Sequence, residues 1–71
     1  MMYRIKTATG LTSEANEEAV RTCLLDAIIE RNDDLESRFR EILLGIRELQ
    51  ANASRDSLKT PNGTLIKRNT P

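Results

Sequence analysis

An apolar seam from about Leu24 to Ala53 constrains the fold of this 71-residue chain more than any other feature. Apolar residues recur along it at the alternating three- and four-residue spacing of a heptad repeat, which is typical of helices that pack along one face. Asn32 is the only polar residue at a seam position, and a single buried Asn in a coiled coil fixes register and favours two strands. The seam positions are Leu25, Ile28, Asn32, Leu35, Phe39, Ile42, Ile46, Leu49 and Ala53.

The seam admits two interpretations, which differ at residues 32–34. In the first, which we favour, one long amphipathic helix spans about residues 13–53, begins at a cap formed by Thr12 or Ser13, and self-associates as a coiled coil. In the second, the helix breaks at residues 32–34, and two such helical hairpins form a four-helix bundle. Both interpretations place the chain in the mainly α class. Both also predict an oligomer, with a homodimer expected and a tetramer as the alternative.

The small size of the chain supports self-association independently of the seam. A chain this short buries a limited core, and its single cysteine and lack of histidine remove disulfides and Cys/His zinc sites as sources of stability. Further apolar residues widen the helical stripe beyond what one partner helix would cover. We expect this extra surface to bind another protein, and its residues are Leu24, Ile29, Leu43 and Leu44.

The two ends of the chain carry strand signals. Residues 3–7 alternate apolar or β-prone residues with basic ones, which predicts a short strand ahead of a linker that ends at residue 11. Residues 58–67 contain Pro61 and Gly63 between β-prone residues, which predicts a β-hairpin. An isolated hairpin is marginally stable, so residues 55–71 are expected to form a basic tail that stays mobile unless it packs on the first strand, the helix or a partner.

Both ends of the chain are basic, and the helical region between them, residues 12–54, is acidic. This division suggests a second class of function, a small dimeric DNA-binding regulator whose basic arms contact phosphates or base edges. Its candidate contacts are Arg4, Lys6, Lys67 and Arg68. Paired N-terminal strands followed by helices resemble the ribbon-helix-helix regulators over residues 3 to about 50. The glycine turn of that family is absent, however, since Gly10 precedes the helix and Gly45 lies late within it, and we assign no family.

Residues that support catalysis or cofactor binding are missing from the sequence. Without histidine the usual general base is lacking, and Cys23 has no visible activating neighbour. The glycines form no phosphate-binding loop, and the acids do not match a calcium loop. We therefore expect a cytoplasmic, non-enzymatic interaction protein, such as an adaptor, inhibitor or regulatory subunit, with no catalytic residues, metal, cofactor or membrane contact.

Overall fold

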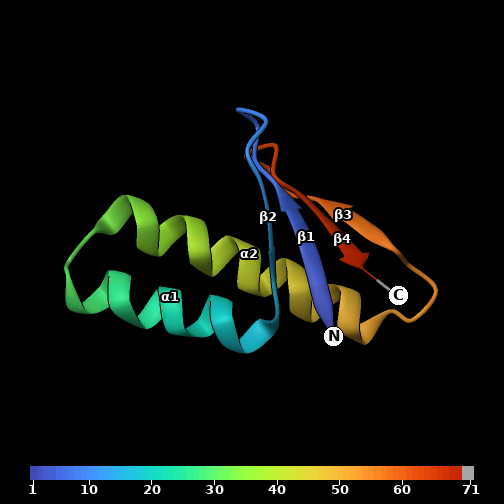
Figure 1. The fold of residues 1–71 in the computed structure, drawn as a ribbon, viewed down its shortest axis with the longest axis horizontal. Coiled ribbons are helices and arrows are strands. Elements are labelled where there is room, and N and C mark those ends of the chain that lie inside the picture. Colours follow the sequence, from blue (N-terminus) through green and yellow to red (C-terminus); the bar gives the residue numbers. More distant parts are fainter. Residues whose placement is uncertain (70–71) are drawn as a thin grey trace.

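Two antiparallel helices pack on one face of a four-stranded antiparallel sheet in the computed structural model, which describes residues 1–69 (Figure 1). The chain is mixed α/β and about half helical, which corrects the mainly α prediction. The strands lie over the end of the helical hairpin where α1 begins and α2 ends, and the opposite end projects beyond the sheet. In chain order the elements are β1 (Met2–Lys6), β2 (Thr12–Ala15), α1 (Glu17–Ile29), α2 (Asp33–Ala51), β3 (Ser57–Lys59) and β4 (Leu65–Asn69).

The two ends of the chain meet at the centre of the sheet, whose strand order is β2-β1-β4-β3. The N-terminal strand and the C-terminal hairpin are thereby confirmed, and the hairpin is ordered because β4 pairs with β1 over its whole length. The first strand is consequently an inner strand of its own chain's sheet. It has no free edge for pairing with a second copy, so the ribbon of paired N-terminal strands is wrong. The last two residues of the predicted tail, 70–71, lie outside the described residues.

Two turns of the same design connect the outer strands to the central ones. In each, a threonine hydroxyl accepts a hydrogen bond from the backbone N–H four residues later, at 3.2 Å from Leu11 to Thr7 and at 3.0 Å from Thr64 to Thr60. In each, the glycine three residues after the threonine has positive φ. The second turn was predicted and the first was not, although the shared pattern Thr-x-x-Gly signals both.

The expected start of the helix at residue 13 is wrong, because residues 12–15 form β2 instead. The helix begins four residues later, where the Asn16 side chain accepts a hydrogen bond of 2.7 Å from the backbone N–H of Ala19. Glu17 and Glu18 lie in the first turn, where carboxylates interact favourably with the helix dipole. Glu17 and Glu18 therefore correctly indicated the first turn of a helix. Residues 12–15 before them form a strand because they pair with β1.

The helical region is broken at residues 30–32, which makes the favoured continuous helix wrong and confirms the helical hairpin of the alternative, with the break two residues earlier than expected. Arg31 adopts a left-handed conformation with φ 55°. Its N–H donates to Ile28 at 3.1 Å and the N–H of Asn32 donates to Ala27 at 2.9 Å, the bond pattern of a Schellman motif that ends a helix. The Asn32 side chain then caps α2 by accepting from Leu35 N–H at 3.2 Å. Asn32 is thus a cap and not a register-fixing residue of a coiled coil.

The core lies between the sheet and the near half of the hairpin. The sheet contributes alternate residues of its central strands, and α2 contributes most of the helical side. Gly45 allows this close approach, because a Cβ at that position would overlap the δ-methyl of Ile66 and lie 3.2 Å from Leu58 Cδ2. The buried core residues are Tyr3, Ile5, Val20, Ile42, Leu43, Ile46, Leu49 and Ile66.

Candidate interaction surfaces

The predicted seam is divided between the core and the surface. Three of its C-terminal members, Ile42, Ile46 and Leu49, are 5%, 0% and 0% exposed and pack within the chain, whereas Ala53 is exposed beyond the end of α2. Its middle members Leu35 and Phe39 are half-buried. The sheet thus occupies the near half of the apolar face that a second copy would cover in a coiled coil.

The N-terminal members of the seam remain on the surface, at the end of the hairpin that projects beyond the sheet (Figure 1). Leu25 and Ile28 are 55% and 42% exposed, and Ile29, one of the predicted partner-binding residues, is 77% exposed. Residues three and four apart are neighbours on a helix, so Leu25, Ile28 and Ile29 form one contiguous patch on α1. We call these three residues the tip patch.

The other three residues of the predicted partner surface do not join the tip patch. Leu24 is half-buried and packs against the core, and Leu43 is 7% exposed within it. Leu44 is 60% exposed and lines a shallow groove of about 500 Å³ between α2 and the edge strand β3. Leu24 and Leu43 therefore contribute to the core, whereas Ile29 and Leu44 lie on two separate surfaces.

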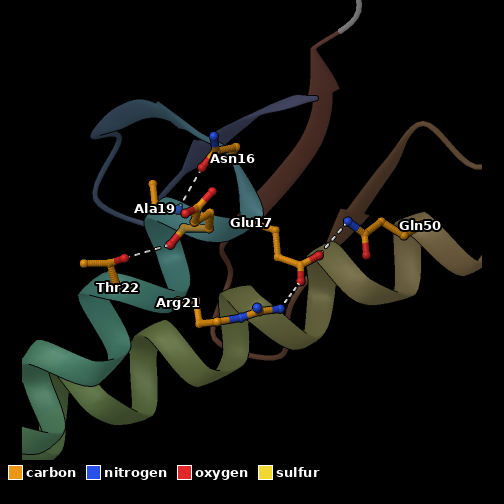
Figure 2. A network of polar contacts seen from close by, with 7 residues as sticks. Asn16, Glu17, Ala19, Arg21, Thr22 and Gln50 are labelled. Carbon is orange, nitrogen blue, oxygen red and sulfur yellow. Dashed lines mark hydrogen bonds and ion pairs between the residues drawn. The ribbon is translucent and has the colours of Figure 1, made fainter.

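The sheet-side end of the hairpin is fastened by a polar network centred on Glu17, the first residue of α1 (Figure 2). One carboxylate oxygen of Glu17 accepts a hydrogen bond of 2.7 Å from the amide of Gln50, in the last turn of α2. The other accepts from Arg21, one turn further along α1. This network joins the two helices at the sheet-side end, far from the tip patch. The position of the tip patch is therefore set by the Schellman junction and by the packing of α1 against α2.

Three of the four predicted basic contacts come together on the face of the sheet opposite the helices. Strand alternation exposes Arg4 and Lys6 on β1 and Lys67 on β4, and β-register places Arg4 directly beside Lys67. Lys59 on β3 joins them, since Leu58 next to it is partly buried on the helix side. Lys59 was not among the predicted contacts, although the alternation of polar and apolar residues around Leu58 indicates its position.

The fourth basic residue, Arg68, lies on the opposite face of the sheet and has a structural role. Its guanidinium donates to the carbonyl of Leu49 at 2.5 Å and to that of Ala53 at 3.4 Å. Asp56 lies 3.9 Å from it, and the Arg68 side chain is only 12% exposed. A cation that binds the last carbonyls of α2 satisfies acceptors left open at the helix end. Arg68 is therefore held at the end of α2 by contacts within the chain.

Other chemical groups add little to these surfaces. Cys23 is exposed on α1. Among residues 1–69, no group of three or more His, Cys, Asp or Glu side chains is placed to hold a metal ion. None of the helices in the described part of the chain has the length and apolar character needed to cross a membrane.

Comparison with known proteins gives one match. No curated protein and no solved structure matches the chain. The model of an uncharacterised protein family matches residues 13–64, a segment that contains both helices and the tip patch but ends before β4. Because this match covers most of the sequence, the chain belongs to the uncharacterised protein family UPF0184.

Proposed function

We propose that this protein is a non-enzymatic interaction protein that self-associates through the projecting end of its helical hairpin. The observation that carries the proposal is the tip patch, in which Leu25, Ile28 and Ile29 expose 55%, 42% and 77% of their surface side by side. Exposed apolar clusters of this kind commonly mark interaction sites. In this role the protein would serve as an adaptor, an inhibitor or a regulatory subunit.

A second copy of the chain is the proposed occupant of the tip patch. The patch lies on α1 at the projecting end of the hairpin, and Leu35 and Phe39 on α2 are only half-buried, so both helices keep exposed apolar surface. Two projecting hairpin ends packed face to face would form a four-helix bundle, with each copy supplying two antiparallel helices. Such an interface is isologous, so the same residues meet on both sides and the assembly closes as a dimer.

The exposed apolar surface sets the expected strength of the dimer. Complete burial of a Leu or Ile side chain contributes about 1.5–3 kcal/mol, so burying what remains exposed of the three residues contributes roughly 3–5 kcal/mol per copy. Two copies then gain roughly 5–10 kcal/mol, against an association cost of at least about 4 kcal/mol. The net gain is at most about 6 kcal/mol, so we expect a weak dimer whose dissociation constant is no lower than tens of micromolar.

The proposal is tested by sedimentation velocity of the full chain from about 10 μM to about 1 mM, a range that begins below the lowest expected dissociation constant. Wild type should shift from monomer to dimer, and Leu25→Glu should remain monomeric because it places a charge in the centre of the interface. Leu44→Glu is the matched control, since Leu44 is 60% exposed but lies on the groove beside β3. Self-association of Leu25→Glu equal to that of wild type, or a wild type that stays monomeric throughout, would sink the proposal.

A further inference from the structure

The open face of the sheet concentrates positive charge. Arg4, Lys6, Lys59 and Lys67 all point away from the helices, because their strand neighbours Tyr3, Ile5, Leu58 and Ile66 pack toward them. Among the strand residues on this face, Glu14 is the only acid in the described part of the chain. We call the four cations the basic face. Since the whole chain has a net charge of zero, the helical layer behind the basic face carries the compensating negative charge.

The register of the strands keeps these cations close together. Arg4 is directly opposite Lys67, and Lys6 and Lys59 flank Leu65 from its two sides. Directly opposed side chains in a sheet lie about 5 Å apart, and alternate residues along a strand lie roughly 6–7 Å apart. Like charges placed directly opposite each other destabilise a sheet, so the Arg4–Lys67 pair is unfavourable unless an anion lies between the two side chains.

Glu14 offsets little of this charge. Its carboxylate lies 3.4 Å from the Arg4 guanidinium, and both side chains are about half exposed, at 47% and 55%. Exposed ion pairs of this kind contribute little and are screened by salt. A ligand phosphate could therefore compete with Glu14 for Arg4, while Lys6, Lys59 and Lys67 have no ion-pair partner within residues 1–69.

The shape and composition of the basic face indicate the class of ligand. Its surface forms an open hollow of about 540 Å³, lined by Arg4, Lys6, Thr12, Ser13, Glu14, Leu65 and Lys67. The chain's aromatic residues lie elsewhere, since Tyr3 is buried under the sheet and Phe39 is on α2. Proteins that bind single-stranded nucleic acid stack bases on aromatic rings, which this face cannot do. Insertion into a membrane surface requires a larger apolar component than Leu65, which is 37% exposed.

We propose that the basic face binds the phosphate backbone of a nucleic-acid duplex, without reading its sequence. Duplex DNA carries a negative charge every ~1.7 Å of its axis, which allows several of the closely spaced cations to contact phosphates at once. The acidic helical layer would orient the molecule, because it is repelled by the same polyanion that attracts the sheet. This binding surface is separate from the tip patch, so it does not depend on the proposed dimer.

The test is fluorescence anisotropy of a labelled duplex of about 20 base pairs, titrated with the full chain at several salt concentrations. Each phosphate contact contributes about −0.9 to the slope of log Kobs against log salt, so wild type should show a slope of about −3 to −4. The double variant Lys6→Gln with Lys67→Gln should lose two contacts, reducing the slope by about 2 and weakening binding at least ~10-fold at low salt. Circular dichroism would verify that the variant folds, and its thermal midpoint should be unchanged or higher because the opposed charges are gone.

The matched control is Arg38→Gln with Arg47→Gln, which removes two exposed cations from α2 and should leave the slope unchanged. Equal losses in the two double variants would overturn the proposal, as would the absence of duplex binding at about 50 mM salt. Binding to a single-stranded oligonucleotide, to polyglutamate or to anionic vesicles that is as tight as binding to the duplex would also overturn it. The variant Leu25→Glu, which removes the proposed dimer, should keep the wild-type salt slope.

Discussion

Gly45 offers the sharpest test of how closely α2 packs on the sheet. The perturbation is Gly45→Ala, made alone and in an Ile66→Val background. At an exposed helical position, Gly→Ala stabilises by about 1 kcal/mol, because glycine is a poor helix former. Gly45 is instead buried beneath β4, and the added methyl would overlap the δ-methyl of Ile66, which is 0% exposed.

The magnitudes follow from these contacts. Overpacking a tight core costs about 1–3 kcal/mol, which exceeds or cancels the gain in helix propensity, so Gly45→Ala alone should destabilise by up to about 2 kcal/mol. Ile66→Val removes the overlapping δ-methyl itself at a cost of about 0.5–1.5 kcal/mol. In that background the new methyl meets only Leu58 Cδ2, at 3.2 Å, and occupies part of the vacated space. There Gly45→Ala should be neutral or stabilising by up to about 1 kcal/mol.

The assay is urea unfolding of the four proteins followed by far-UV circular dichroism, at a concentration below that of dimer formation. The double-mutant cycle should give a coupling free energy of at least about 1 kcal/mol between the two positions. Additive effects, within about 0.5 kcal/mol, would show that α2 does not approach Ile66 as described and would refute the packing argument.

Three further substitutions test the junction between the helices and the buried end of β1. Arg31→Gly should stabilise the protein by about 0.5–1 kcal/mol in thermal or urea unfolding, because φ 55° is strained for arginine; a loss of about 1 kcal/mol would instead indicate a continuous helix. Asn32→Leu should lower the free energy of unfolding by about 1 kcal/mol, because the hydrogen bond from Leu35 N–H to the Asn32 side chain is lost. The oligomer number measured by light scattering should stay unchanged. A variant that is more stable and has a different oligomer number would instead support a coiled coil. Tyr3→Phe should stabilise by about 1 kcal/mol, since the Tyr3 hydroxyl is buried without a hydrogen-bond partner among the described residues; a marked loss of stability would reveal a partner for that hydroxyl.

Local signals in the sequence were sufficient where the backbone itself sets the conformation. Pro61 and Gly63 predict the C-terminal turn because proline fixes φ and glycine accepts a positive φ, and the structure places them in that turn. The junction at residues 30–32 carries a weaker signal, because arginine rarely adopts the left-handed conformation found at Arg31. The sequence therefore presented the break only as an alternative, and the continuous helix was favoured wrongly.

The candidate surfaces could be predicted only in part. Of the four residues predicted to bind a partner, Ile29 and Leu44 are exposed, and the basic character of residues 4, 6 and 67 is evident from the sequence. The sequence does not show which cations share a face of the sheet, because that depends on strand register. Lys59 joins the basic face, while Arg68 binds the carbonyls at the end of α2. The two basic residues 67 and 68 are adjacent in sequence and lie on opposite faces of the sheet for this reason.

The sequence by itself determined that most of the region between residues 13 and 53 is helical with an apolar face and that both ends of the chain form strands. Only the tertiary structure decided what covers that face, because the apolar spacing that packs a helix against a second copy also packs it against a sheet. The sheet forms when β4, near the end of the chain, pairs with β1, near its start. No local sequence pattern encodes a contact between residues so far apart in sequence. The sheet covers Ile42, Ile46 and Leu49, whereas Leu25 and Ile28 stay exposed because they lie off the buried side of α1, which carries Val20 and Ala27.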